Sequence, residues 1–509
     1  MSATTVQSDI PRSDSSPGVR SRVWYWAPLA VVLVAGSVLR LINLGHSYWG
    51  DEDMTVRLLR ESPWYMFRHG IPGDESTPPL YYVIASPWSR LFGTTEFAVR
   101  SLTAIIGVAT MAVAYPIGTE LRSRRAGLIL ASLVAVSPLM LWFSQDARAY
   151  ALAILLTSVA LLFFAQALRT TSSRSIWLWA FASAAALTAH YFAIFVVVPE
   201  ALVLLFDRRT RSRAVWPSVL VAVIWIALLP LLLFQASHAG NISWIKFLSL
   251  TDWLKLTLQF FDTGSWALSF LLLACVTAAI AGIVGYAFVA HRIDRREWVI
   301  LGVGNSSILL PVIAWLAGHD YVNYQNLVPS WMPFAAVLAT ALASLKRVGA
   351  VLAVVVCGLS LAATVKIETT PDLQRPNWRQ AAHVLSTEPP HTLFVIYPAF
   401  DFGALRWYGH GASHVTSDSV RTRRLVVLAE DPWSYSAAHT LVLHTPSGFH
   451  ETGKKSFSTF VMVTYSAPVA VPVSVHQLSL MRPSGHLLSN TPWTSWVFVD
   501  RPTQAQTSS

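Results

Sequence analysis

Charged residues are scarce in this chain: they make up 13% of its 509 residues, whereas hydrophobic residues make up 54%. Soluble domains carry about 25% charged residues. The scarcity excludes a soluble enzyme with a single anchor and indicates an integral membrane protein with many spans. A net charge of +10 would suggest nucleic acid as the partner of a soluble protein. Here the basic residues lie in short loops between apolar runs, as the positive-inside rule predicts, so we expect no nucleic-acid partner.

Cysteine is also nearly absent. The only two, Cys275 and Cys357, lie inside apolar runs, so we interpret them as reduced packing residues and expect no disulfide. The chain has no cysteine–histidine spacing of the zinc type, no phosphate-binding GxxxxGKS/T loop and no GxGxxG pattern. The sequence therefore gives no support for a nucleotide-sugar or ATP site on the cytoplasmic side.

Long apolar runs are abundant, and a membrane helix needs about 20 apolar residues to cross the hydrocarbon. The predicted spans are 23–44, 97–118, 126–143, 150–168, 176–189, 191–206, 215–235, 265–290, 298–316, 327–345 and 348–365. Strongly basic loops alternate with aromatic loops that are poor in lysine and arginine. This alternation predicts eleven spans in the plasma membrane, a cytoplasmic N-terminus and an extracytoplasmic C-terminus. A single helix over 176–206 would reverse everything downstream, but the basic loop 207–213 argues against it.

The chain divides into three parts. Residues 1–22 lack an apolar period and predict a disordered cytoplasmic tail, not a cleavable signal. Residues 23–365 form the predicted transmembrane catalytic domain, whose first outer loop is 46–96. Residues 366–509 hold the strand-like runs TLFVIY, RLVVLA, TLVLH, TFVMVTY and VSVHQLSL, with a helix expected at 378–385. We therefore predict a polytopic α-helical membrane protein with a C-terminal extracytoplasmic α/β domain.

The first outer loop is too long and too patterned to be a simple connector. We predict a short helix over 52–60 and a second one that opens at Ser62–Pro63, with proline at its first position. The paired prolines Pro78–Pro79 introduce a re-entrant or span-like helix over 80–92. Farther along, TDWLKLTLQFF at 251–261 predicts an amphipathic helix on the outer surface.

The stretch SYWGDEDMTVR, residues 47–57, places three consecutive carboxylates directly behind the first span: Asp51, Glu52 and Asp53. Acidic residues beside hydrocarbon are costly, so they usually face a cavity and take part in chemistry. The alternative is a solvated loop that happens to be acidic.

The stretch SQDARAY places Asp146 and Arg148 between two predicted spans on the same outer side. One interpretation is an internal salt bridge between these two residues. The other is an anion site, because the arginine fork matches the oxygens of a phosphate, and Tyr150 could add a hydroxyl donor.

Arginines in the first outer loop favour the anion site, because the positive-inside rule disfavours them there. They are Arg57, Arg60, Arg68 and Arg90. A lipid phosphate would offset their charge. The alternative for each is a structural pair with a loop acid such as Glu61, Asp74 or Glu75.

The outer loops also carry the clusters His190–Tyr191 and His319–Tyr321. A lone interfacial histidine is more often a hydrogen-bonded packing residue than a metal ligand. No certain cofactor follows from the sequence, although the Asp/Glu cluster could hold a divalent metal ion that shares a bound phosphate.

The order of DE in the first outer loop, then PPLYY, SQDARAY and an aromatic HYF turn, resembles the GT-C glycosyltransferases over about residues 40–390. The resemblance is closest to bacterial glycosyltransferase family 39, which is related to protein O-mannosyltransferases and lipid A aminoarabinose transferases. The segment LQRPNWRQAAHVL, residues 373–385, is similar to the start of the outer domain in actinobacterial members.

The resemblance implies a polyprenyl-phosphate sugar as donor, with mannose as the leading sugar, transferred on the outer face to a glycan, lipid or protein acceptor. It implies that Asp51 is catalytic, with Glu52 beside it. The candidate donor-binding residues are Arg57, Asp146, Arg148, Tyr150, His190 and Tyr191. The chain departs from many relatives at Thr77, where they carry lysine or histidine, and at Gln325, where an arginine is common.

Two other functions compete with the transferase: a transporter or flippase for lipid-linked envelope glycans, and a non-catalytic assembly scaffold. Transporters tend to show internal repeats and broken helices near the midplane. The sequence shows no repeat, and its charges lie at the outer face. A scaffold would not need the Asp51 and Arg148 patterns, which are both present.

Overall fold

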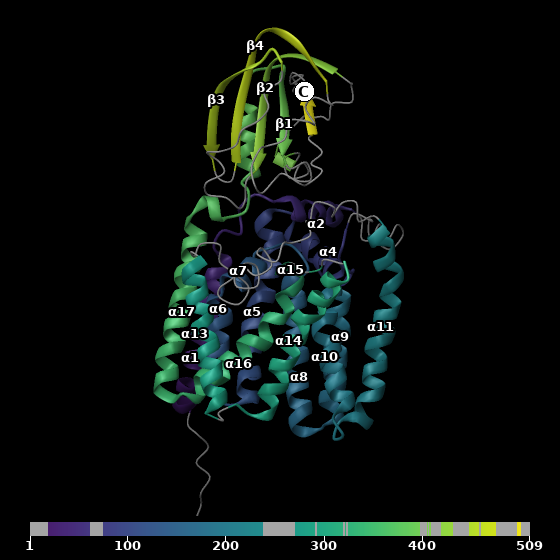
Figure 1. The fold of residues 1–509 in the computed structure, drawn as a ribbon, viewed down its shortest axis with the longest axis vertical. Helices are drawn as coiled ribbons and strands as arrows, with labels where there is room; N and C mark the ends of the chain where they lie inside the picture. Colours follow the sequence, from purple (N-terminus) through teal and green to yellow (C-terminus); the bar gives the residue numbers. More distant parts are fainter. Residues whose placement is uncertain are drawn as a thin grey trace, which may run out of the picture.

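The computed structural model describes residues 19–61, 75–237, 270–290, 293–318, 321, 324–397, 405, 407–408, 419–430, 447–457, 460–474 and 496–499. Within these residues the chain forms a bundle of long helices with a β-sheet at one end (Figure 1). Several predictions lie outside the described residues. They concern the helix from Ser62, the helix over 251–261, Arg68, the His319–Asp320 pair and the run TLVLH.

The bundle follows the predicted spans. Its helices are α1 (Val19–Leu41), α5 (Glu96–Leu121), α6 (Arg124–Val136), α7 (Pro138–Ser144), α8 (Tyr150–Thr170), α9 (Ser173–Ala189), α10 (Ile194–Phe206), α11 (Arg211–Ser237), α13 (Phe270–Val289), α14 (Arg295–Leu316), α15 (Tyr324–Leu327), α16 (Trp331–Ser344) and α17 (Lys346–Thr369). Among the described residues, six helices are long and apolar enough to cross a membrane, and the bent pair α6–α7 makes a seventh. The chain is therefore a multi-pass membrane protein, and the count of eleven spans stays a prediction.

The bend between α6 and α7 has a local cause. Pro138 cannot donate a backbone hydrogen bond, so α6 ends before it, and Ser137 caps α7 by accepting from the Met140 N–H. The two helices meet at 63°. The carbonyls of Val134 and Ala135, near the break, accept hydrogen bonds from the buried Arg40 side chain at 2.9 and 3.2 Å.

The structure resolves the segment 176–206 into two helices, α9 and α10, separated by an extended residue at His190. The Arg213 side chain donates to the Thr171 carbonyl, so the start of α11 lies beside the start of α9. Because α10 ends at Phe206, just before α11, the start of α9 and the end of α10 lie at the same end of the bundle. The turn at His190 is at the other end, where Tyr191 contacts α11. The chain crosses the bundle twice here, as the basic loop 207–213 predicts.

The basic loops gather at the end of the bundle that is opposite to the sheet. Arg122 Nη1 lies 2.9 Å from Glu297 Oε1 and joins the end of α5 to the start of α14. Arg125 donates to the Lys346 carbonyl at the start of α17. These contacts place the arginine-rich loops on one side, as the alternation of loop types predicts.

We expect cysteines at the exposed positions Arg208 and Arg295 to resist an impermeant thiol reagent in intact cells. A cysteine at the exposed Gly45, at the sheet end, should react. The background would be a variant without Cys275 and Cys357, and permeabilised cells would show that every introduced thiol is reactive. Labelling of the Arg208 or Arg295 variant in intact cells would contradict the cytoplasmic assignment of the basic end.

A small sheet caps the other end of the bundle. Its strand order is β3-β4-β2-β1-β5, with β1 parallel to β2 and the other pairs antiparallel. The strands are β1 (Thr392–Tyr397), β2 (Ser419–Glu430), β3 (His450–Phe457), β4 (Phe460–Ser474) and β5 (Trp496–Val499). TLFVIY, RLVVLA and TFVMVTY fall on β1, β2 and β4. VSVHQLSL overlaps only the end of β4 in the described residues.

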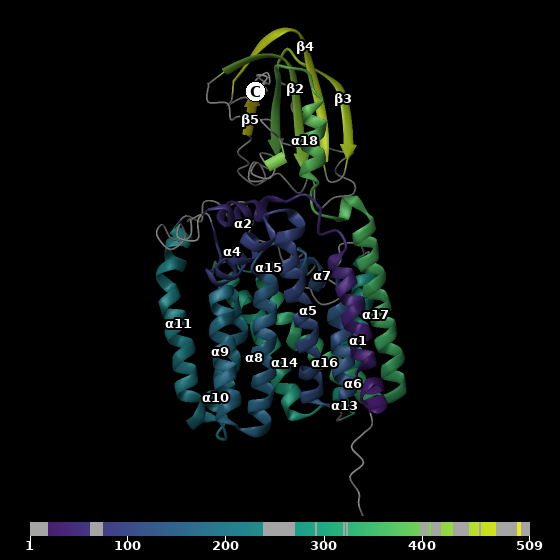
Figure 2. The same cartoon turned by 180° about the vertical axis from the view of Figure 1, so that it is seen from behind.

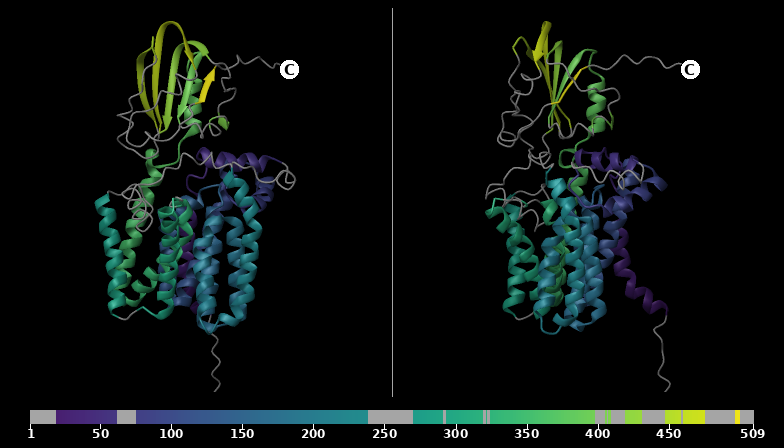
Figure 3. Two further views of the ribbon diagram at one scale, coloured as in Figure 1. Left: turned by 45° about the vertical axis from the view of Figure 1, so that its right-hand side comes forward. Right: turned by 90° about the vertical axis from the view of Figure 1, so that its right-hand side faces the viewer.

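One helix, α18 (Trp378–Ser386), packs on a face of this sheet (Figures 2 and 3). Trp378 is fully buried and its ring meets Phe460 of β4 edge to face at 4.7 Å. We call α18 and the strands the sheet unit. The preceding helix α17 runs through residue 366, where the sequence places the boundary, and ends at Thr369.

Two short helices, α2 (Gly50–Arg60) and α4 (Leu80–Phe92), lie between the bundle and the sheet unit (Figure 1). The segment before α2 contacts the sheet side directly. Ser47 Oγ donates to the Pro376 carbonyl at 3.1 Å, and the Tyr48 N–H donates to the Tyr408 hydroxyl at 2.7 Å. That hydroxyl donates in turn to Glu96 at the start of α5. The sheet side therefore helps to hold the chain just before the acidic stretch.

Candidate active site

The three carboxylates of the acidic stretch occupy the first turn of α2, where negative charge is favoured by the helix dipole. The N-cap residue, Trp49, offers no side-chain oxygen to cap the helix. Helical spacing then separates the three side chains. Asp51 stays partly exposed, whereas Glu52 and Asp53 are buried. The structure thus assigns the three acids to different surroundings.

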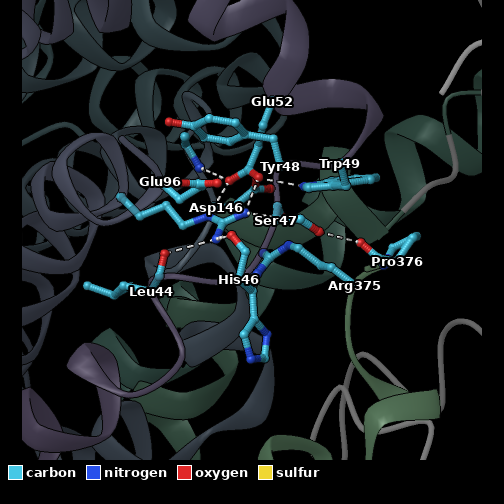
Figure 4. Close-up of polar contacts among 12 residues, drawn as sticks. Leu44, His46, Ser47, Tyr48, Trp49, Glu52, Glu96, Asp146, Arg375 and Pro376 are labelled. Carbon is cyan, nitrogen blue, oxygen red and sulfur yellow. Dashed lines mark hydrogen bonds and ion pairs between the residues drawn. The ribbon is translucent and has the colours of Figure 1, made fainter. Parts of the chain in front are cut away.

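Glu52 is held by a buried arginine from α5. Arg100 Nε donates to Glu52 Oε1 at 2.8 Å and its Nη2 donates to Oε2, while the Ala147 N–H donates to Oε1 at 2.9 Å. The remaining Arg100 donors reach the carbonyls of Leu44, His46 and Ser47 (Figure 4). Burial works to raise the pKa of Glu52, but Arg100 outweighs it and leaves the pKa below its usual range. Glu52 is therefore ionised and engaged on both oxygens.

Asp51 has a different environment. Loss of water around its carboxyl raises its pKa, and the neighbouring carboxylates Glu75 and Glu52 add to the rise, although Arg148 opposes it. The Gln325 side chain from α15 hydrogen-bonds this carboxyl. Asp51 is thus a partly exposed carboxylate with a raised pKa.

Arg148 is directed at Glu75. Its Nη1 and Nη2 donate to the two Glu75 oxygens at 2.6 and 2.9 Å, which is a bidentate pair between two buried side chains. Nη1 also lies 3.1 Å from the Tyr82 hydroxyl. The ion pair expected between Arg148 and Asp146 does not form, because Glu75 takes the guanidinium. Thr77, which stands where many relatives carry a basic residue, donates its hydroxyl to Glu75 at 2.8 Å.

Asp146 is fully buried, and only one of its two carboxylate oxygens accepts a hydrogen bond. Its Oδ1 accepts from Trp49 Nε1 at 3.3 Å, whereas its Oδ2 is buried without a hydrogen-bond partner. Burial raises the pKa of Asp146 to about 7, and the nearby Arg375 guanidinium opposes the rise. Figure 4 shows Trp49, Asp146 and Arg375 on one side of the cluster.

Arg375 belongs to the segment between α17 and α18 and is the third residue of LQRPNWRQAAHVL, a segment from which the sequence alone predicts no site residue. Its Nη2 donates to the Trp142 carbonyl at 2.8 Å, and its guanidinium carbon lies 4.2 Å from the centre of the Trp142 ring. Three separate parts of the chain therefore meet here: the acidic stretch, the SQDARAY turn and the segment leading to the sheet unit.

Comparisons with known proteins agree with this architecture. Residues 76–234 match the family of dolichyl-phosphate-mannose-protein mannosyltransferases. The apo crystal structure of ArnT from Cupriavidus metallidurans aligns with a TM-score of 0.52 and 14% identity, over 89% of this chain and 100% of that one. Its complex with undecaprenyl phosphate aligns with a TM-score of 0.50 and 15% identity, over 88% and 99%.

This chain has a GT-C glycosyltransferase fold. No curated protein sequence matches it. In this GT-C chain, the family match contains Arg148 and Asp146 but starts after Asp51 and ends before Arg375. The roles of the last two residues therefore depend on the geometry alone.

Three further predicted donor-binding residues of this GT-C chain, Tyr150, His190 and Tyr191, have packing or structural contacts. Tyr150 packs between Phe143 and His190, with ring centroids at 5.0 and 5.3 Å. His190 Nδ1 is buried without a partner, and burial lowers the pKa of His190 to about 4. The Tyr191 hydroxyl donates to Gln235 Oε1 at 2.8 Å, so it braces α11.

Arg57, the other predicted donor-binding residue, makes no described contact with Asp146 or Arg148. Its side chain is 58% exposed and pairs with Asp53 at 2.9 Å, one turn earlier on α2. Arg60 stacks on Trp407 at 3.8 Å and so faces the sheet side. These two arginines thus have structural partners, although neither pairs with one of the loop acids Glu61 and Glu75 that the sequence suggests.

In the described residues, no three His, Cys, Asp or Glu side chains come together in a way that could hold a metal ion. The acidic stretch explains why. Glu52 is paired with Arg100, Asp53 is paired with Arg57, and the Asp51 carboxyl is hydrogen-bonded by Gln325. This part of the chain offers a divalent ion no set of three ligands.

Proposed function

We propose that this protein is a glycosyltransferase that moves a sugar, mannose in the first instance, from a polyprenyl-phosphate donor to an acceptor on the outer face of the membrane. The observation that carries the proposal is Asp51, a partly exposed carboxylate with a raised pKa inside a cluster of buried ion pairs. A GT-C fold and a structural relative bound to undecaprenyl phosphate support the choice of donor. The sugar rests on the name of the matching family alone.

The mechanism follows from the residue types. The acceptor hydroxyl attacks the anomeric carbon of the sugar, and Asp51 takes the hydroxyl proton as general base. The bond from that carbon to the phosphate oxygen breaks, and polyprenyl phosphate leaves with the bonding electrons. Positive side chains stabilise the leaving phosphate. We assign Glu52 a structural role instead of the catalytic role suggested by the resemblance, because both of its oxygens are engaged.

The direct test is to incubate the purified protein with polyprenyl-phosphate mannose and, in parallel, with polyprenyl-phosphate pentoses. Release of free polyprenyl phosphate that depends on the protein supports the transferase. Release from the pentose donors alone would correct the sugar. If the protein moves lipid-linked glycans across vesicles and cleaves none of these donors, the flippase alternative replaces the proposal.

The raised pKa of Asp51 predicts how transfer depends on pH. A general base works only when it is deprotonated, so the rate should rise with pH through the pKa of Asp51 and then level off. Because that pKa is raised, the acid limb should lie above the range of a free aspartate, about 3.9. The measurement is the transfer rate at saturating donor across pH. An acid limb at the position of a free aspartate would contradict the role of Asp51.

A further inference from the structure

A donor phosphate needs a cation whose charge is not already neutralised. The two buried arginines of the cluster do not meet this need. Arg100 donates through Nε and Nη2 to the two oxygens of Glu52. Arg148 donates through Nη1 and Nη2 to the two oxygens of Glu75. Separating either pair would leave an uncompensated buried charge, which is strongly unfavourable.

Arg375 is different. No carboxylate of the described residues lies within ion-pair distance of it, and its hydrogen bond in this part of the chain is the one from Nη2 to the Trp142 carbonyl. A buried Nε without a partner is common to Arg375 and Arg148 and does not separate them. The Trp142 carbonyl and the Trp142 ring hold the guanidinium in place. The acid that acts on it most strongly, Asp146, is the buried carboxyl whose pKa is raised to about 7. Arg375 therefore keeps a positive charge that nothing in the described cluster fully neutralises.

Exposure also separates Arg375 from its neighbours. Asp51, Trp49 and Arg375 are each partly exposed, whereas Asp146 and Arg148 are buried. A carboxyl, an aromatic ring and a cation of this cluster are thus each partly exposed, and Figure 4 shows Trp49 and Arg375 on the same side of the cluster.

We propose that Arg375 is the residue that binds the phosphate of the lipid-linked donor, so that the segment leading to the sheet unit completes the donor site. This inference rests on the proposed function. The Nε is buried, but Nη1 and the second hydrogen of Nη2 are not used by Trp142, and this edge of the guanidinium can donate to two phosphate oxygens. The fork stabilises the negative charge that gathers on the phosphate as the sugar leaves.

The test is to measure binding of undecaprenyl phosphate to the purified full-length protein and to its Arg375→Gln and Arg375→Lys variants. A charge-assisted hydrogen bond contributes about 1.5–3 kcal/mol, so Arg375→Gln should weaken binding about ten- to a hundredfold. Arg375→Lys keeps the charge but loses the fork and should fall between Gln and wild type. Thermal unfolding of each variant shows whether it is folded.

The matched control is Arg379→Gln. Arg379 is the second residue of α18, four positions after Arg375, and it pairs with Glu96 at 2.5 Å. The Arg379→Gln substitution should leave the affinity for undecaprenyl phosphate unchanged. If the wild type binds and folded Arg375→Gln or Arg375→Lys binds equally well, the inference is wrong while the proposed function stands. If the wild type does not bind undecaprenyl phosphate, the donor class itself is wrong and both fall.

Discussion

Replacing Asp51 by asparagine should slow sugar transfer at least about 100-fold, the usual scale for loss of a general base. Asparagine keeps the size of the side chain and can still contact Gln325, but it cannot take the proton of the acceptor hydroxyl. The variant should fold, because asparagine can keep the hydrogen bond with Gln325 of α15 and the backbone carbonyl of residue 51 that Arg148 contacts is unchanged. Its affinity for the polyprenyl-phosphate donor should also stay close to that of the wild type. The measurements are transfer rate and donor affinity for the same preparations.

Asp53→Asn is the matched control for this experiment. Asp53 lies two residues farther on the same helix and pairs with Arg57, away from Gln325 and Arg148, so this variant should keep the transfer rate. Glu52→Gln should lower stability instead, because it leaves Arg100 buried without a full charge partner. Near-normal transfer by Asp51→Asn would remove this residue from the chemistry.

Removing either member of the Arg148–Glu75 pair should destabilise the protein by about 3–5 kcal/mol, because the partner is left charged and buried. The sequence alone suggests that Arg148→Ala should mainly weaken donor binding, with a smaller loss for Arg148→Lys. The bidentate contact with Glu75 changes that expectation to a loss of fold stability. Thermal unfolding of Arg148→Ala and Glu75→Gln in detergent is the measurement.

Arg169→Ala serves as the control here, because Arg169 is largely exposed and its partner Glu120 keeps a second ion pair with Arg296, so stability should change by about 1 kcal/mol or less. A combined Arg148→Met and Glu75→Gln variant should recover part of the loss, because no unpaired charge remains. A stable Arg148→Ala variant that no longer binds the donor would restore the phosphate role of Arg148.

Local patterns predict the elements well in this chain. Residues 80–92, behind the paired prolines, form α4 over the expected range, and the acidic stretch opens α2 two residues before its expected start. These features depend on proline, helix dipole and apolar period within a few neighbouring residues. The strand β1 at 392–397 was also predictable, because TLFVIY is a short run of apolar, β-branched and aromatic residues.

The pairings of the site were not predictable in this way. Arg100 lies 48 residues from Glu52, inside an otherwise apolar run, and nothing local indicates which acid it meets. A lone arginine in a predicted span was still a usable signal, because a charge at that depth requires a partner. The resemblance marks the positions of Gln325 and Arg375, but it does not indicate which residues they contact. Those contacts depend on how distant segments return to the acidic stretch.

The bend between α6 and α7 bears on how the protein is assembled in the membrane. Arg40 enters with α1, the first helix to be synthesised, but three of its hydrogen-bond acceptors lie 94 to 104 residues later in the chain. Until residues 134–144 have been synthesised, the Arg40 side chain of α1 lacks these acceptors and can only extend toward the interfacial water. The arrival of the α6–α7 corner gives this arginine its carbonyls and fixes α1 in its final place. A substitution at Pro138 that straightens the corner would act on biogenesis, by leaving the first helix without its anchor.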